Sequence, residues 1–235
     1  RLGGDDVNRL LGVTVPDGFF DGSSPFDIVF QAGEGVALNI SSNLDGLAVS
    51  LPLPFNKSPE QSESLEIDLR ISDALSIDAT YSNNLSLSIA QDTENAWRAL
   101  ASIGEVRSEF TLDDVDAGTA VISGRLEELD ISAWADTQAR FRSGGNPGLP
   151  AIVWRDFSVD KLALGETDFG AFSSTGQYEG GLTSLGLAGD FIKAQIDFDG
   201  PEAQLNIQIE SLSLDSLPNI NIATLDVESD NPAAA

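Results

Sequence analysis

Acidic side chains are the main candidates for chemistry in this sequence, because it contains 38 Asp and Glu residues but no His and no Cys. Without these two residue types, Ser-His-Asp catalysis, imidazole zinc sites and thiol chemistry are excluded. The adjacent pairs Glu127–Glu128 and Asp113–Asp114 are nominal candidates for a glycosidase carboxylate pair. Neighbouring residues on a strand point to opposite faces, so neither pair converges on a substrate. The sequence therefore predicts no catalytic residue and no enzyme activity.

Two short acidic segments, Asp113–Gly118 (DDVDAG) and Asp197–Gly200 (DFDG), could offer oxygen ligands to calcium. Neither continues into a complete calcium-binding loop with its distal Glu. Acidic turns that face solvent explain both segments more simply. We therefore expect no metal site and no cofactor, and calcium remains only within an alternative given below.

The charge of the chain excludes some partners. Lys and Arg together number 12, so the formal net charge is −26. Such a surface repels phosphate backbones, so no nucleic-acid partner is expected, and it also disfavours docking on anionic headgroups. The chain has no Met, so we expect it to be a piece of a longer protein. No run approaches the roughly 20 apolar residues of a membrane span, so any anchor is expected outside this piece.

Apolar and polar residues alternate with a period of two along much of the chain, which predicts β-strands. Residues 65–71, 75–81 and 85–89 follow this pattern with short turns between them, so a meander of three hairpin-linked strands is expected. The alternation returns in several segments between 157 and 227. The alternation predicts an all-β fold class with a mainly antiparallel sheet and one or two short helices.

Few helices are expected. Residues 5–13 could form two turns capped by Asp5 or Asp6, and residues 132–141 could form another helix with Ser132 as N-cap. Residues 94–106 have helical propensity but are interpreted as strand. The Gly- and Pro-rich segment 142–151 is a candidate break, although we expect a single continuous sheet system over residues 1–235 with a frayed tail at 229–235.

A strand with this alternation has one apolar face, which must be covered by a second sheet, by curling of the sheet, or by a ligand. The alternation alone favours a closed sandwich core over an open hydrophobic groove. Two features point toward the groove: many of the inward positions are medium-sized aliphatic residues, and no second set of strands is obvious. The predicted groove lining is Leu65, Ile67, Leu69, Ile71, Leu75, Ile77, Leu85, Leu87, Ile89, Ile192, Ile196, Leu205, Ile207 and Ile209.

The segment 51–64 (LPLPFNKSPEQSES) interrupts the alternation. Pro52 and Pro54 cannot donate to a ladder, so they are expected at a sheet edge or strand end. We interpret the segment as a crossing between strands at the rim of the sheet. An ordinary loop of a sandwich is the alternative.

Three segments, taken in order, resemble the AsmA-like, YhdP-type proteins of Gram-negative bacteria. Ser41–Ser72 resembles that family's strand, Leu-Pro-x-Pro, small-polar loop and second strand. Ile122–Phe141 resembles its Gly-Arg-Leu-x-x-Leu-Asp-x-x-x-Trp element, and Phe157–Gly181 resembles its Leu-x-Leu-Gly-x-x-x-Phe-Gly hairpin. The strong acidity and the polar stretch 92–97 (DTENAW) depart from the family pattern and are expected to be peripheral.

The resemblance implies an elongated, twisted, mainly antiparallel sheet curved into an open hydrophobic groove. It also implies that the chain is one segment of a large periplasmic protein that is anchored in the inner membrane. It implies that the groove shields the acyl chains of phospholipid and conducts lipid between the inner and outer membranes, which supports outer-membrane integrity. The implied partners are phospholipid and the rest of the same long chain with its membrane anchor.

Two other interpretations stay open at this point. One is a secreted or cell-surface β-sandwich that serves as a binding or adhesion module, with calcium as a stabilising ion. The other is a purely structural spacer of the cell envelope.

Overall fold

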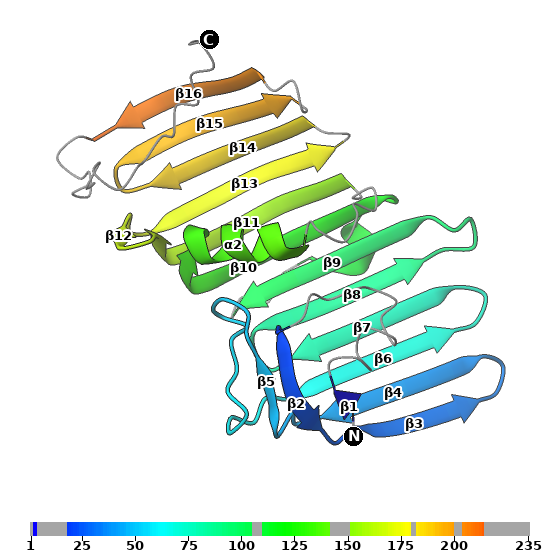
Figure 1. Ribbon diagram of the computed structural model, residues 1–235. Helices are drawn as coiled ribbons and strands as arrows, with labels where there is room; N and C mark the ends of the chain where they lie inside the picture. The colour runs from blue at the N-terminus through cyan, green and yellow to red at the C-terminus, as the bar shows by residue number, and fades with distance from the viewer. Residues whose placement is uncertain are drawn as a thin grey trace, which may run out of the picture.

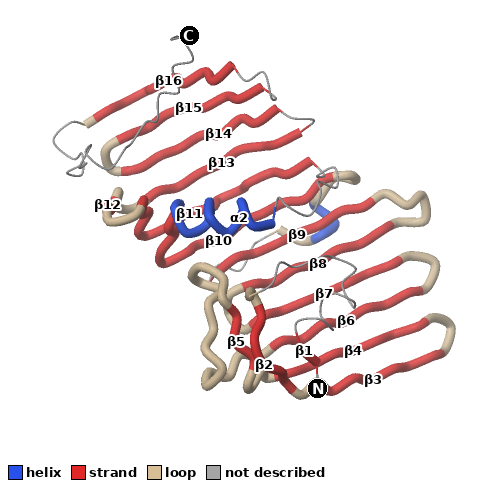
Figure 2. The backbone as a smooth tube through the Cα atoms, in the orientation of Figure 1, coloured by secondary structure: helices blue, strands red, loops and turns tan. Residues whose placement is uncertain are grey.

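The computed structural model describes residues 2–3, 18–104, 110–141, 151–179, 182–199 and 204–213. Strands dominate this part of the chain, as Figure 2 shows by colour. The large sheet contains β3 (Asp27–Ala32), β4 (Val36–Ser42), β6 (Leu65–Ile71), β7 (Leu75–Tyr81), β8 (Leu85–Gln91), β9 (Trp97–Gly104), β10 (Thr119–Asp130), β11 (Ala151–Leu164), β12 (Thr167–Asp168), β13 (Phe172–Glu179), β14 (Leu182–Gly189), β15 (Ile192–Asp199) and β16 (Gln204–Leu212). A small sheet contains β1 (Leu2–Gly3), β2 (Phe20–Ser24) and β5 (Leu47–Val49). The described helices are α2 (Ile131–Phe141) and the 3₁₀ helix η1 (Leu112–Asp114).

The large sheet is one open, elongated layer (Figure 1). Its strands follow a continuous order from β16 to β3, and β12 pairs beside β11. Neighbouring strands are antiparallel, except that β10 is parallel to both β9 and β11. The order does not return on itself, so the sheet is not a barrel, and strands spaced about 4.8 Å apart extend it over roughly 50 Å. The predicted all-β fold with a mainly antiparallel sheet is confirmed.

The predicted meander is present as β6, β7 and β8. Ile67 lies opposite Ala79, and Ala79 lies opposite Leu87, so the three apolar sets are in register. The turn between β6 and β7 is closed by the amide of Ser72, which donates to the carbonyl of Ala74 at 3.0 Å, a typical backbone hydrogen-bond distance. Residues 97–104, interpreted as strand despite their helical propensity, form β9.

The predicted helix at 132–141 is present as α2, but its predicted N-cap is wrong. Oδ1 of Asp130 accepts hydrogen bonds from the amides of Ser132 and Ala133, at 2.9 and 3.3 Å. Asp130 is therefore the N-cap, and Ser132 lies inside the first turn. A parallel pair such as β10 and β11 needs a long crossover, and α2 lies in this crossover. The helix predicted at 5–13 falls outside the described residues.

The candidate break 142–151, apart from its last residue, and the tail 229–235 also fall outside the described residues. On either side of the former, β10 and β11 pair along most of their length. The extent of the domain stays a prediction.

A small second layer was not predicted. Figure 1 shows β2 and β5 lying across one end of β6–β9, on the same side of the sheet as α2. Pro52 and Pro54 follow directly after β5, in the loop that leads to β6, so the expectation of a strand end is met. Leu44, Leu47 and Tyr81 form the buried cluster at this junction.

Candidate functional site

The strand register aligns one apolar row across the whole large sheet. Following the paired residues from β3 to β16, the row consists of Ile28, Ile40, Ile67, Ala79, Leu87, Ala101, Ile122, Trp154, Gly176, Leu185, Ile196 and Ile207. No member of this row carries a charge or a hydrogen-bonding group other than the indole of Trp154. Because side chains alternate across a strand, the neighbouring rows at two-residue spacing lie on the same face. We call this side of the sheet the apolar face.

The opposite side of the sheet is mainly polar. The row displaced by one residue consists of Val29, Asn39, Asp68, Asp78, Ser88, Leu100, Val121, Val153, Gln177, Ser184, Asp197 and Asn206. Its aliphatic members apart from Val29 are confined to the three central strands. Two exposed ion pairs lie on the polar side, Arg70–Asp78 at 3.6 Å and Arg125–Asp160 at 2.7 Å. The two sides therefore differ in solvation along the length of the sheet.

All the predicted lining residues whose side chains are described lie on the apolar face. They are Leu65, Ile67, Leu69, Ile71, Leu75, Ile77, Leu85, Leu87, Ile89, Ile192, Ile196, Ile207 and Ile209. The backbone of Leu205 pairs with Phe198. The exposed fractions of Ile71, Ile207 and Ile209 are 47, 50 and 54%, so part of this face is open to solvent. Whether these residues contact lipid stays a prediction.

Further members of the apolar face were not predicted. They are Ile28, Phe30, Leu38 and Ile40 on β3 and β4, Leu185 and Leu187 on β14, and the centre of β9–β11. Phe30 is the most exposed of the large apolar side chains, at 64%. The apolar/polar alternation in residues 28–40 and 182–189 would have been sufficient to predict these members. In β9–β11, the apolar/polar alternation is less clear, because these central strands also carry aliphatic residues on the polar side and β11 contains a bulge.

One end of the apolar face is covered by a cap, which we define as residues 44–64 with β2. Leu65 and Leu85, predicted as open lining, pack here against the buried Leu44, Leu47 and Tyr81. These two predicted lining residues therefore lie beneath protein in this structure. The cap is held together internally by Lys57, whose buried Nζ donates to the carbonyls of Leu47 and Ser58 at 2.7 and 3.0 Å.

The helix α2 covers the apolar face at β10 and β11. Leu126, Val159 and Ala163 lie on this face and are 4–5% exposed, in contrast to the half-open aliphatics of β6–β8. At the start of the helix, the indole of Trp134 contacts the cap. Its Nε1 donates to the carbonyl of Leu53 at 3.3 Å, and its ring meets that of Phe55 edge-on at a centroid distance of 6.0 Å.

The segments that follow β11 and β14 add an aromatic cluster, and the pairing of Phe172 with Val159 places Phe172 on the apolar face. The ring of Phe191 lies 5.8 Å from that of Phe169 and 5.6 Å from that of Phe172. A Cβ on Gly189 would lie 2.8 Å from the Phe172 ring, so glycine permits this packing. The three segments quoted for the family resemblance therefore contain the cap loop, α2, and Phe169 and Phe172 of this cluster.

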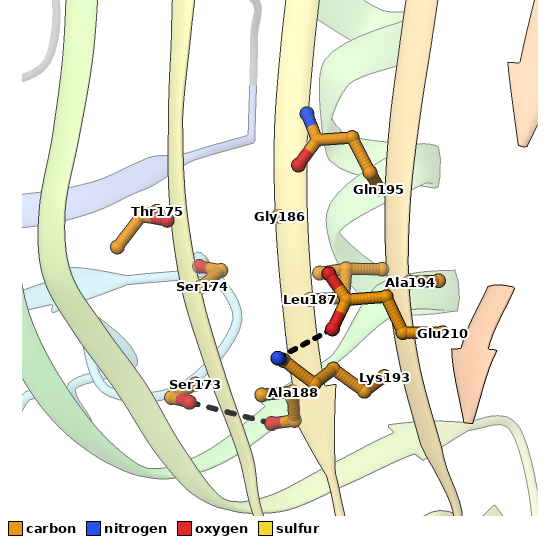
Figure 3. Close-up of a pocket in the computed structure, with 10 residues that line it drawn as sticks. All are labelled: Ser173, Ser174, Thr175, Gly186, Leu187, Ala188, Lys193, Ala194, Gln195 and Glu210. Carbon is orange, nitrogen blue, oxygen red and sulfur yellow. Dashed lines mark hydrogen bonds and ion pairs between the residues drawn. The ribbon is translucent and has the colours of Figure 1, made fainter. Parts of the chain in front are cut away.

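A shallow hollow of about 300 Å³ lies over β13–β16 (Figure 3). Thr175, Gly186 and Gln195 lie across from one another on the polar side, and the missing side chain of Gly186 leaves the space. Lys193 and Glu210, which form an ion pair, close one end. The lining combines hydroxyl, amide and paired charged groups, without a nucleophile next to a general base.

The acidic pairs considered above have local roles. Glu127 and Glu128 are adjacent on β10, and Glu128 pairs with Lys161 at 2.7 Å, which raises the pKa of that lysine. The amide and hydroxyl of Thr111 both donate to Asp114 at 2.8 Å and lower its pKa. Within the described ranges, no group of three or more acidic side chains is placed to hold a metal ion.

Comparisons with known proteins agree with the resemblance. The family model described as YhdP protein matches residues 18–234. No curated protein and no solved structure matches the chain. Across the described residues, no helix has the length and apolar character needed to cross a bilayer. Because the match covers more than nine-tenths of the sequence, the chain belongs to the YhdP protein family.

Proposed function

We propose that the apolar face binds the acyl chains of phospholipid and that the chain is a segment of a conduit for lipid. In this proposal the whole protein is anchored in the inner membrane, extends through the periplasm and conducts phospholipid between the inner and outer membranes. It thereby supports outer-membrane integrity, and it acts by solvation without catalysis. Membership of the YhdP family supports a role in lipid transport in general terms.

The single observation that carries the proposal is the apolar row that crosses the large sheet from β3 to β16 in register. A soluble protein rarely exposes contiguous apolar patches beyond a few hundred Å² unless they bind something. Among the described residues, the cap and α2 cover only part of this face, and no second sheet of similar size faces it. A sandwich core would need such a sheet, so the module alternative is not favoured.

The dimensions of the face suit acyl chains. A strand of seven residues, such as β6 or β7, is about 24 Å long, whereas one leaflet of hydrocarbon is about 15 Å thick. At roughly 25 cal/mol per Å², covering a few hundred Å² of aliphatic surface would contribute several kcal/mol. Because the side chains along the row are similar, an acyl chain would make similar contacts at each position. It could therefore move along the face without reaching a position of especially tight binding.

The polar side would face water in this arrangement. Its carboxylates repel anionic headgroups, which disfavours binding of lipid by that side. The headgroup would then project from the open side of the apolar face toward water.

Quenching of tryptophan fluorescence by brominated phospholipid tests the proposal. Trp97 lies on the apolar face and is 44% exposed, so a variant with Trp134→Phe and Trp154→Phe retains it as the single reporter. The control carries Trp97→Phe as well, with Ser86→Trp on the polar side. We expect strong quenching of Trp97 and weak quenching at position 86. Equal quenching at both positions, or none at Trp97, contradicts the proposal.

A further inference from the structure

The cap differs from the rest of the fold in how it is attached. Inside the cap, the amides of Val49 and Lys57 exchange hydrogen bonds of 2.8 and 2.9 Å with each other's carbonyls. The amide of Gly46 donates to the carbonyl of Pro59 at 3.0 Å. Together with the buried ammonium of Lys57, these bonds make the cap a unit that can keep its own structure.

The base of the cap loop is tied to the β7–β8 turn, whereas its tip at residues 53–55 is held by two longer hydrogen bonds. At the base, the amide of Ser82 donates to the carbonyl of Ser64 at 2.7 Å, and the amide of Ser64 donates to Oγ of Ser82 at 3.0 Å. Nε1 of Trp134 donates to the carbonyl of Leu53 at 3.3 Å, and Nδ2 of Asn84 donates to the carbonyl of Pro54 at 3.2 Å. The tip also makes an apolar contact, through the ring of Phe55 with that of Trp134 and with the aliphatic ends of β6 and β8. An acyl chain could replace this apolar contact without leaving a charge unpaired.

Beneath the cap lies one polar group whose hydrogen-bonding capacity is unused. The side chain of Tyr81 is 9% exposed, and its hydroxyl is fully buried without a partner among the described residues. Its ring stacks on that of Phe55 at a centroid distance of 6.4 Å. Burial, and then the nearby carboxylate of Glu63, raise the pKa of Tyr81, so the hydroxyl keeps its proton at neutral pH. A buried hydroxyl without an acceptor destabilises the closed arrangement.

We propose that the cap is a lid over the end of the apolar face, and that a phospholipid acyl chain displaces it and places its ester carbonyl as the acceptor for Tyr81. This inference rests on the proposed function, because it assigns a polar anchoring point within the same face. The lid opens at the contact of Trp134 with Leu53 and Phe55. An acyl ester supplies both parts of the site, a chain for Leu65 and Leu85 and an oxygen for the hydroxyl.

Paired ester and ether lipids test the role of the hydroxyl. Dihexanoylphosphatidylcholine and its diether analogue, both used as monomers, differ in the carbonyl groups alone. The full chain should bind the ester roughly threefold to tenfold more tightly, as measured by calorimetry, which corresponds to one net hydrogen bond. In Tyr81→Phe the ratio should fall to about one, as expected when that bond is lost. Thr80→Val, which removes a hydroxyl from the adjacent polar-side position, should keep the ratio of the parent.

Hydrogen–deuterium exchange tests the lid itself. Saturation with the ester lipid should increase amide exchange in residues 50–64 and 131–137, while exchange in β6–β8 should fall. If exchange in those two segments does not change at saturation, or if Tyr81→Phe keeps the parent's ratio, the lid inference is wrong although lipid still binds. If neither lipid binds to the parent chain, the proposed function fails and the lid inference fails with it.

Discussion

Replacing Ile77 by Asp places one charge in the middle of the apolar face. Ile77 lies directly opposite Leu69 on β6 and Ile89 on β8, and its side chain is half-buried. Without lipid, the substitution removes about half the value of a buried aliphatic side chain and one cross-strand contact. We expect the free energy of unfolding to fall by about 1–2 kcal/mol.

The effect on lipid binding should be larger. An acyl chain over position 77 forces the new carboxylate to lose water or to bind a proton. Protonation at pH 7 of a group with a pKa near 3.9 costs up to about 4 kcal/mol, or roughly a thousandfold in affinity. Each unit by which the pH is lowered toward 4 should recover about tenfold of that loss. This pH dependence separates a solvation effect from a general loss of structure.

The assay is mass spectrometry of lipid retained after gentle purification, followed by binding titrations between pH 5 and 7. Ile77→Val keeps the face apolar and should retain lipid. Ser86→Asp adds the same charge on the polar side, opposite the neutral Thr80 and Ser102, and should also retain lipid. If Ile77→Asp is folded by circular dichroism and retains as much lipid as Ser86→Asp, acyl chains do not lie over β7 and the reasoning is refuted.

Three further predictions concern stability, each measured by denaturant unfolding. A Cβ on Gly124 would lie 2.0 Å from the carbonyl oxygen of Ile103, so Gly124→Ala should lower the free energy of unfolding by about 3 kcal/mol or more. Gly118 also has a positive φ but open space around it, so Gly118→Ala should lower it by only about 1–2 kcal/mol. Similar losses in the two variants would contradict the steric argument. Because burial raises the pKa of Tyr81, the parent should keep its stability below pH about 10 and lose part of it as the pH rises further. Tyr81→Phe should lack this part of the loss. Parallel curves of stability against pH for the two proteins would show that Tyr81 is not the group responsible. Asp130→Ala should lower the free energy of unfolding by about 0.5–2 kcal/mol, because it removes the N-cap of α2. An unchanged unfolding midpoint would show that this N-cap hydrogen bond contributes nothing to stability.

The predictions that succeeded depend on patterns within a few residues. Period-two alternation located β6, β7 and β8 and identified the apolar side of each strand. The helical segment of α2 was located as well. The error there was in its N-cap, because Asp130 and Ser132 are both good capping residues two positions apart, and only the backbone geometry decides between them.

The features that were missed depend on contacts between distant residues. The bond from Trp134 to the carbonyl of Leu53 joins positions 81 residues apart, and no local pattern predicts it. The small sheet of β1, β2 and β5 pairs segments of a few residues each, too short for a clear alternation. The parallel pairing of β9, β10 and β11 could not be predicted either, because the sequence pattern of a strand does not specify which other strand it pairs with.

By itself the sequence determined that the chain forms strands with one apolar and one polar side, since side chains alternate with the backbone pleat wherever a strand forms. It also determined the strongly acidic surface and the absence of histidine and cysteine chemistry. Only the tertiary structure decided that twelve strands pair with their apolar sides in one row, and that the cap and α2 cover the ends of β6–β11 while leaving other aliphatics open. Strand register and lid packing are set by pairing across the fold, and a shift of one residue would have turned the same side chains to the opposite face.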